Sequence, residues 1–369
     1  MKADDNRHTE KTPGKFSQYG IYKKVLLITL ILSVTPILIF GLYTILTLDT
    51  TGDDIVNEIE NVLDSKVRET LELQAHFTAS SVTKFLKQRE IDLLNLAEII
   101  PTEKHYFDFY KLHKSEIWIR TGYNETPHEA KISIPMYKEI SFIDKNGWEK
   151  IRITNNSVIE KKNLKDVSKP ENTTYGVENY FEETIRLKPF EIYVSHVTGF
   201  YITEHEQLGD ADNIEEAVET PIYNGVVRMA MPVYNNDNVI GIVMIAIDHQ
   251  HFMEFTQHIL PNSSKQTVFP SYNSGNYAFM FDDRGWIITH PKYWDIPGID
   301  ENGDWVKAYS ENSSEEDIKA GRIPFNLDTA GFVHPNYPIV AKAVRNKETG
   351  SKVTTNIGGI QKVMAYAPI

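Results

Sequence analysis

The residues best suited to chemistry follow one apolar segment, where Asp248, His249 and His251 lie in the run Asp-His-Gln-His-Phe. A carboxylate and two imidazoles are ligands that zinc accepts, and on a continuing strand the two histidines would share a face. A further ligand would have to come from one of three distant histidines: His196, His205 or His290. A histidine pair alone is a weak metal signal, so we favour a solvated strand end and expect no metal ion.

Catalytic motifs are the next features to weigh. Ser271, Ser274 and several aspartates are present, but the sequence has no Gly-x-Ser-x-Gly elbow, phosphate loop or His-Glu-x-x-His helix. The glycine segments 272–275 and 356–359 are interpreted as turns rather than oxyanion or phosphate cradles. Cysteine is absent, which excludes disulfides, thiolate metal sites and a cysteine nucleophile. We therefore expect no enzyme activity in this chain and no cofactor.

Composition limits the class of protein and its partners. The chain has 369 residues, 41% of them hydrophobic, which is enough to bury more than one core. The formal net charge is −13. Nucleic-acid binding normally needs a basic face, so we expect no nucleic-acid partner.

One segment near the start predicts a membrane anchor. Residues 25–48 carry no charge and are about as long as a bilayer-spanning helix requires. Lys23 and Lys24 precede this segment, while Asp53 and Asp54 follow it. This asymmetry predicts that residues 1–24 are a cytoplasmic tail and that everything after residue 48 is extracytoplasmic. A cleaved signal peptide is the alternative, but the apolar run is long for one and no small-residue cleavage site follows.

A long helix is expected next, over residues 49–100. The segment has no proline until Pro101, and its apolar residues recur at helical spacing. A helix from Asp53 to about Ile100 would be roughly 70 Å long. It is either a stalk that reaches the membrane or an amphipathic core helix, and the second description suits its C-terminal half.

An internal repeat predicts two similar modules. Asp144-Lys145-Asn146-Gly147-Trp148 and Asp282-Asp283-Arg284-Gly285-Trp286 share the spacing Asp-x-x-Gly-Trp, and similar segments around Pro232 and Pro368 follow at nearly equal distances. We assign a membrane-distal module to residues 101–262 and a proximal one to residues 263–369. In the proximal module, segments 277–281 and 286–289 are expected to pair as a hairpin. The strand that follows Pro232 has no counterpart after Pro368, so we expect the natural chain to continue.

Strands of the distal module are predicted at 138–143, 148–154, 191–195, 226–233 and 239–248. The acidic segment 203–219 between the third and fourth is expected to be an exposed excursion. The segment 311–338 of the proximal module is rich in Pro, Gly and Asn, which predicts an irregular but ordered loop.

An apolar anchor, a long helix and two tandem strand sets resemble the double Cache sensor domains of microbial transmembrane receptors. The resemblance covers nearly everything from residue 50 onward, and its segments are DKNGWEKIRI, ENYFEETIRLKPFEIYVSHVTGFY, VVRMAMPVYNNDNVIGIVMIAID, NYAFMFDDRGWIITHPKYWDIPG and KVMAYAPI. It implies an α+β fold with two PAS-like antiparallel sheets, the second lacking its last strand.

The resemblance also implies a function. Such a domain would be the extracytoplasmic small-molecule-sensing input of a transmembrane signal-transduction receptor, such as a histidine kinase or chemotaxis receptor. Ligand binding in the distal module would be relayed by the long helix, and a homodimer is expected. A membrane-tethered hydrolase and a protein-binding scaffold are the alternatives. A second membrane-spanning run and a signalling module further along the chain would favour the sensor.

Site residues follow from the same resemblance. Amino-acid-binding members carry an Arg-x-Trp-Tyr run, then a Tyr and an Asp, and a final Asp at the end of the last strand. The corresponding run here begins with Glu178 in place of the arginine and ends with Tyr180 and Phe181. The ligand-binding residues implied for this chain are Tyr180, Phe181, Tyr193, Ser195, Arg228 and Asp248.

The ligand these residues favour is an amine or another small metabolite. Asp248 could pair with an ammonium group, and the aromatic rings could add cation–π attraction. The alternative for Asp248 is that it only caps the next turn. An anionic ligand remains an alternative if the Arg228 side chain points inward.

Overall fold

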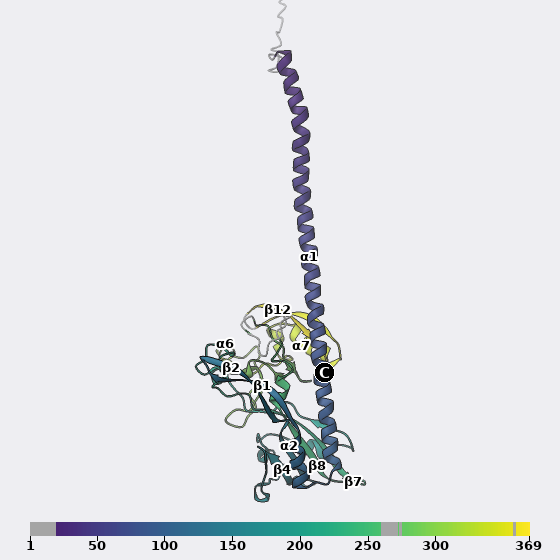
Figure 1. The fold of residues 1–369 in the computed structure, drawn as a ribbon, viewed down its shortest axis with the longest axis vertical. Helices are drawn as coiled ribbons and strands as arrows, with labels where there is room; N and C mark the ends of the chain where they lie inside the picture. Colours follow the sequence, from purple (N-terminus) through teal and green to yellow (C-terminus); the bar gives the residue numbers. More distant parts are fainter. Residues whose placement is uncertain (1–19, 260–271, 273–274, 357–358) are drawn as a thin grey trace, which may run out of the picture. The chain divides into compact units, whose positions relative to one another are not determined.

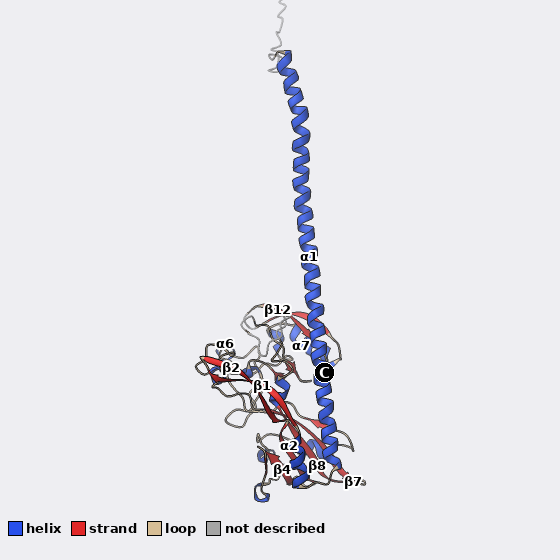
Figure 2. Cartoon of the chain, viewed as in Figure 1, coloured by secondary structure: helices blue, strands red, loops and turns tan. Residues whose placement is uncertain are grey.

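The computed structural model describes residues 20–259, 272, 275–356 and 359–369 (Figure 1). The chain divides into two compact units, Met1–Val67 and Arg68–Ile369. Mixed helices and antiparallel sheets make it an α+β protein, as expected (Figure 2).

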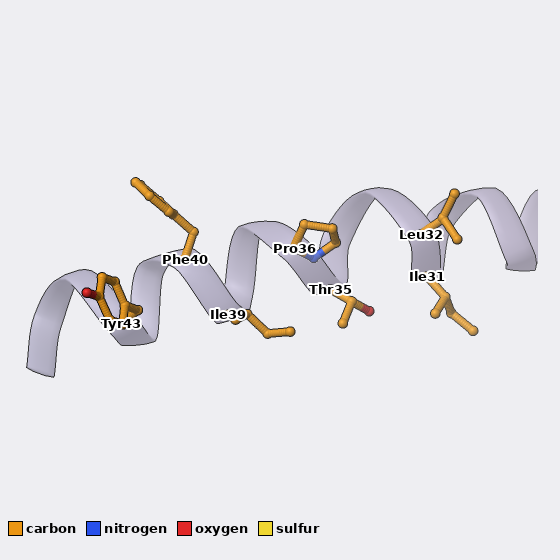
Figure 3. Close-up of a pocket in the computed structure, with 7 residues that line it drawn as sticks. All are labelled: Ile31, Leu32, Thr35, Pro36, Ile39, Phe40 and Tyr43. Carbon is orange, nitrogen blue, oxygen red and sulfur yellow. The ribbon is translucent and has the colours of Figure 1, made fainter.

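The described part of the first unit is helical and belongs to α1 (Ile21–Glu98). Its segment Ile21–Thr47 is long and apolar enough to cross a membrane, with a mean hydropathy of 2.7, close to the predicted residues 25–48. Pro36 lies inside this helix, where it removes one backbone N–H and disturbs the carbonyl four residues earlier. Seven side chains of this single helix, Pro36 among them, line a shallow hollow: Ile31, Leu32, Thr35, Pro36, Ile39, Phe40 and Tyr43 (Figure 3). Among the described residues, no other element contributes a wall to it.

A six-stranded antiparallel sheet is the centre of the second unit, with the order β5-β4-β3-β8-β7-β6. Its strands are β3 (Tyr137–Asp144), β4 (Glu149–Thr154), β5 (Ser157–Val158), β6 (Tyr193–Val194), β7 (Val226–Asn235) and β8 (Asn238–Asp248). All five predicted strands are confirmed, with small shifts at their ends. The apolar run of β8 is explained by burial on both faces of the sheet.

The remaining elements surround this sheet or follow it. They are α2 (Glu103–Leu112), β1 (Lys114–Tyr123), β2 (Thr126–Pro135), α3 (Tyr180–Ile185), α4 (Glu204–Leu208), α5 (His249–Met253), β9 (Met280–Phe281), β10 (Ile287–Thr289), α6 (Glu315–Lys319), α7 (Asn336–Arg345), β11 (Gly350–Thr355) and β12 (Gln361–Tyr366).

One face of the sheet packs against the C-terminal part of α1. Val82, Leu93 and Leu96 are buried there together with Ile245 and Ile247 of β8. This part of α1 is therefore a core helix. That is what the sequence analysis considered for the C-terminal half of residues 49–100.

A buried carboxylate fixes α1 to the sheet. Asp92 Oδ2 accepts hydrogen bonds from Arg89 Nε at 2.8 Å and from the Tyr137 hydroxyl of β3 at 2.5 Å. Burial alone would raise the pKa of Asp92, but His113, Tyr137 and Arg89 together lower it to about 2. The carboxylate therefore stays charged and holds the helix on β3.

The repeated Asp-x-x-Gly-Trp segments form identical turns. In the first, the Asp144 carboxylate accepts from the amides of Asn146 and Trp148 at 2.9 and 3.1 Å, and Gly147 N–H donates to the Asp144 carbonyl. The second turn repeats the two carboxylate bonds from Asp282 to Arg284 and Trp286, at 2.9 and 3.0 Å. These bonds explain the spacing, because the aspartate satisfies two amides while glycine adopts positive φ.

The same turn occurs twice more, where the sequence analysis did not look for a repeat. The Asp300 carboxylate accepts from Asn302 and Asp304, both at 2.9 Å. Between β11 and β12, Asn356 Oδ1 accepts from Ile360 N at 2.8 Å and the Asn356 carbonyl accepts from Gly359 N at 2.9 Å. Residues 273–274 and 357–358 of the two glycine segments interpreted as turns lie outside the described residues.

The hairpin of β1 and β2 was not predicted. Its register runs from Lys114 opposite Pro135 to Tyr123 opposite Thr126. Near its tip, Asn124 Oδ1 accepts from the amides of residues 218 and 219 in the acidic segment. The expectation that this segment is an exposed excursion is wrong, since much of it is half-buried and the Gln207 side chain is buried.

In the proximal region, antiparallel pairing is confirmed but the pairs are small. Among the described residues, β9 pairs with β10 and β11 with β12 as two separate two-stranded sheets. The hairpin of residues 277–289 is thus shorter than predicted. The segment 311–338 is an irregular ordered loop that contains α6, one 3₁₀ turn at Ala330–Phe332 and the first residues of α7, as expected.

Two glycines of the repeated turns provide a matched stability test. Gly147 and Gly303 have φ of +91° and +87°, but a Cβ on Gly147 would lie 2.5 Å from Ser168 Cβ, whereas one on Gly303 meets nothing within 4 Å. Gly303→Ala should therefore cost only the left-handed backbone strain, about 1–2 kcal/mol. Gly147→Ala should cost at least about 1 kcal/mol more. Urea unfolding of both variants measures the difference, and equal losses would contradict the contact with Ser168.

Candidate ligand site

A buried arginine marks the face of the six-stranded sheet that α1 does not cover. Arg228 lies on β7 opposite Ala246 of β8, and its side chain is 1% exposed. Its neighbours Val227 and Met229 belong to the core on the α1 side. Because side chains alternate along a strand, Arg228 points to the other face, so the inward orientation considered for it is confirmed.

Two glutamates balance Arg228. Its Nε lies 2.5 Å from Glu178 Oε1 and its Nη2 lies 3.1 Å from Glu178 Oε2, a bidentate pair. Glu139 Oε1 of β3 lies 3.5 Å from Nη1. Burial alone would lower the pKa of Arg228, but Glu178 and Glu139 raise it well above its ordinary value. The guanidinium therefore remains charged inside the protein.

A second arginine extends the cluster along β4. Arg152 Nη2 lies 3.1 Å from Glu139 Oε2, and Nη1 lies 3.5 Å from Glu149 Oε1. Three carboxylates thus face two guanidiniums, which leaves one negative charge in excess. Among the described residues, Glu149 Oε1 and Arg152 Nε are buried without a hydrogen-bond partner. Burial raises the pKa of Glu149 above its ordinary value.

Aromatic side chains cover the cluster. The Tyr180 ring on α3 lies 4.9 Å from the Arg228 guanidinium carbon, a cation–π contact. Phe181 is buried beside it, and Tyr175 donates its hydroxyl to the Asn224 carbonyl at 2.9 Å. Charged groups under aromatic walls could hold a small polar ligand that carries a complementary charge.

The structure brings most of the predicted site residues to this face. Tyr180, Phe181 and Arg228 are in one cluster, and Tyr193 of β6 packs against it opposite Ala230. Ser195 Oγ accepts from the Arg228 backbone amide at 2.9 Å, so its hydroxyl supports the strand edge. Ligand contact by these residues stays a prediction.

Asp248 has a structural role of its own. Its Oδ1 accepts from Gln250 N at 3.0 Å and caps α5, and Lys138 Nζ lies 3.6 Å away. The capping role considered from the sequence is confirmed. Its role as a ligand anchor stays a prediction, because only Oδ1 is used by the cap.

The histidine pair does not share a strand face. The strand ends at Asp248, and His249 and His251 lie on α5, where residues two apart point in different directions. Their Nε2 atoms contact the carbonyls of Ile288 at 2.7 Å and Pro135 at 3.0 Å. The expectation of a solvated strand end is therefore wrong: both imidazoles are buried, and burial lowers the pKa of His249 to about 4.

The other residues considered for chemistry are dispersed. His205 is exposed on α4, and His290 contacts the backbone of Lys292. His196 Nδ1 lies 2.5 Å from Asp282 Oδ2, and with Asp283 it forms a group whose ligand atoms lie within 4.8 Å of one another. Ser271 and Ser274 are outside the described residues.

Sequence reasoning missed Glu139, Glu149 and Arg152. A usable signal was present, because Glu139 precedes Ile140 and Arg152 lies between Ile151 and Ile153, so polar and apolar residues alternate there. Charges on the same face of neighbouring strands indicate either a solvated face or a buried network. Only the position of α3 and the loop before it distinguishes the two.

Removing the Arg228 guanidinium should lower the free energy of unfolding. Arg228→Met leaves Glu178 and Glu139 buried without their main partner, so the free energy of unfolding should fall by about 3–5 kcal/mol. The double variant Arg228→Met with Glu178→Met should recover part of this loss. Arg186→Met, which breaks an exposed pair with Glu182 on α3, is the control and should change little. Urea unfolding measures all three, and a small loss for Arg228→Met would contradict the network.

Comparison with known proteins gives similarity at the level of solved structures. No protein-family model and no curated protein matches the sequence. A domain assigned to the sensory box/GGDEF family of Vibrio parahaemolyticus is 13% identical with a TM-score of 0.42, and the match covers 82% of this chain and 97% of that one. The ligand-binding domain of the Pseudomonas fluorescens chemoreceptor CtaA, in complex with L-serine, is 11% identical with a TM-score of 0.38 over 83% and 88%. The extracellular domain of a protein assigned as a histidine kinase has a TM-score of 0.42 at 13% identity over 82% and 93%. Each of these three neighbours is a domain of a protein whose description places it among sensory proteins, histidine kinases or chemoreceptors.

Proposed function

We propose that this chain is the extracytoplasmic, small-molecule-sensing input of a transmembrane signalling receptor, anchored by Ile21–Thr47. The observation that carries the proposal is the buried charged cluster around Arg228, on one face of a sheet whose other face packs on α1. A ligand that changes the charge balance of the cluster acts directly on β7 and β3. These strands contact the helix that contains the apolar segment, so the binding face and the helix share one sheet.

An amine is the ligand class that fits the cluster best. The carboxylates of the cluster outnumber its guanidiniums by one, and no group donates a hydrogen bond to Glu149 Oε1 among the described residues. An ammonium group would supply both the missing charge and the missing donors. Tyr180 and Tyr193 provide aromatic faces for the same group. An anionic ligand could accept a hydrogen bond from Arg152 Nε, but it would add to the negative charge that is already in excess.

A homodimer in the membrane is part of the proposal. Five apolar side chains on the exposed part of α1 are each at least half exposed: Val62, Leu63, Val67, Leu73 and Phe77. Large apolar groups in such numbers on one helix favour burial against a second helix. The same helix of a second copy is the partner that presents a matching surface.

A ligand screen tests the proposed site. Thermal-shift measurements on the chain in detergent micelles should show stabilisation by amines rather than by carboxylates or purines. Glu149→Gln removes the excess charge and should weaken the best amine about tenfold. The exposed Glu160→Gln is its matched control and should leave affinity unchanged. Stabilisation by carboxylates alone would overturn the assignment of the ligand class.

Asp248→Asn separates the two roles of Asp248 in the same assay. Asparagine keeps an oxygen that can cap α5 but removes the charge. A tenfold lower affinity for the amine would support contact between Asp248 and the ligand. An unchanged affinity would leave Asp248 with the capping role alone.

Signal transfer through α1 gives a further prediction. Val67→Pro interrupts the hydrogen-bond ladder of the helix away from the charged cluster, so ligand-dependent output of the complete receptor should be lost while affinity is unchanged. Val67→Ala keeps the helix and should keep the output. Full output from the proline variant would contradict coupling through α1.

A further inference from the structure

A partly exposed histidine lies where α2, the sheet and α1 meet. His113 follows α2 and precedes β1, and its carbonyl accepts a hydrogen bond from the amide of Met136, the residue before β3, at 2.8 Å. Its ring stacks on Phe109 of α2 with ring centroids 3.9 Å apart. The imidazole is therefore held in place by a backbone bond on one side and an aromatic ring on the other.

Both ring nitrogens of His113 face acceptors. Nδ1 lies 2.7 Å from the Phe109 carbonyl oxygen, and Nε2 lies 3.5 Å from Asp92 Oδ1 on α1. A neutral imidazole carries one N–H, which can serve only one of these two acceptors and turns a lone pair toward the other. The imidazolium carries an N–H on each nitrogen. The arrangement therefore suits the protonated side chain.

The Asp92 carboxylate gives this proton a consequence for α1. It accepts from Gln88 Nε2 at 3.2 Å and from Arg89 Nε at 2.8 Å, but both of these donors belong to α1 itself. Among the described residues, the side chains outside α1 that contact the carboxylate are His113 and Tyr137 of β3. Loss of the His113 proton thus removes one of two polar ties between this carboxylate and the rest of the second unit.

The surroundings of His113 favour its charged form. The titratable or charged groups that face it in the described part of the chain are Asp92 and Arg89 of α1 and Tyr137 of β3, whose ring centroid lies 6.0 Å away. The Asp92 carboxylate raises the pKa of His113 above its ordinary value of 6.5, against the opposing effects of burial and Arg89. The side chain is 28% exposed, so solvent can exchange the proton.

We propose that His113 is a pH-sensitive link between α1 and the sheet. The imidazolium ties Asp92 to the segment between α2 and β1, and its deprotonation removes this tie, so that the C-terminal part of α1 opens from the sheet more often. The link lies in the core on the α1 side, to which Tyr137, Val82 and Leu93 belong. It does not depend on the function proposed for the Arg228 cluster.

The direction of the pH effect follows from the raised pKa. The tie contributes fully below the unfolded pKa of about 6.5 and is lost as the pH rises through the folded value. The partners of Asp92 hold its pKa at about 2 despite its burial, so it stays charged throughout this range. Burial lowers the pKa of His249 and His290 to about 4 and 3, so both stay neutral. None of these three groups titrates in the range where the link is lost.

A histidine titration tests the protonation state on the chain in detergent micelles. The protein is labelled at histidine Cε1, and the ring resonances are followed by NMR from pH 5 to 9. The resonance that is missing in His113→Gln belongs to His113. Its midpoint should lie above 6.5 because the carboxylate stabilises the imidazolium. A midpoint at or below 6.5 overturns the proposal.

Hydrogen exchange tests the effect on α1. Amide protection in Arg89–Glu98, corrected for the intrinsic pH dependence of exchange, should fall between pH 6 and pH 9. The loss should reach about tenfold for each unit by which the folded pKa is raised. His113→Gln cannot titrate, so its protection should be the same at both pH values.

His105→Gln is the matched control. His105 lies on α2, is exposed, and contacts the Ile100 carbonyl through Nδ1 at 3.0 Å, but it forms no ion pair with a carboxylate among the described residues. This variant should keep the full pH response of the unsubstituted chain. Equal protection of Arg89–Glu98 at pH 6 and pH 9 in the unsubstituted chain overturns the proposal. A pH response that persists in His113→Gln, or that disappears in His105→Gln, overturns it as well.

Discussion

A charged guanidinium that is 1% exposed can persist in a protein only if carboxylates surround it. Arg228 sets this condition for much of the second unit. Glu139 must face Arg228 from β3, which determines which residues of that strand point to this side of the sheet. Glu178 must reach Arg228 from the loop before α3. The bidentate contact then holds α3 over the sheet and places the Tyr180 ring over the guanidinium. The covering layer of this face thus depends on one ionic requirement as well as on apolar burial.

The two faces of the sheet are held by different forces. On the α1 side, leucine, valine and isoleucine pack with one fixed carboxylate, Asp92. On the other side, charge pairs and aromatic rings carry much of the contact. Apolar packing tolerates small sliding, whereas bidentate charge pairs tolerate little displacement. A displacement on the charged face would therefore act on β3 and β7, the strands that also pack against α1.

The sequence predicted the elements whose signals are local. The five strands of the distal module and the long helix follow from apolar runs, and the Asp144 and Asp282 turns follow from a spacing that the carboxylate bonds explain. The hairpin of β1 and β2 escaped prediction because β2 is mostly exposed and shows little alternation. The charged cluster escaped for a different reason. Glu139 and Arg152 read as surface residues until a loop without periodicity covers them, and no local pattern encodes that cover. His249 and His251 were misplaced because one capping residue, Asp248, converts the strand end into a helix.

The proline in the apolar part of α1 affects how this helix can carry mechanical load. Pro36 has no amide hydrogen, so the carbonyl of Leu32, labelled beside it in Figure 3, loses its usual helical donor. A helix with one missing rung bends more readily at that point than an unbroken helix does. A single imino acid thus places a compliant joint inside the segment that is long and apolar enough to cross a membrane.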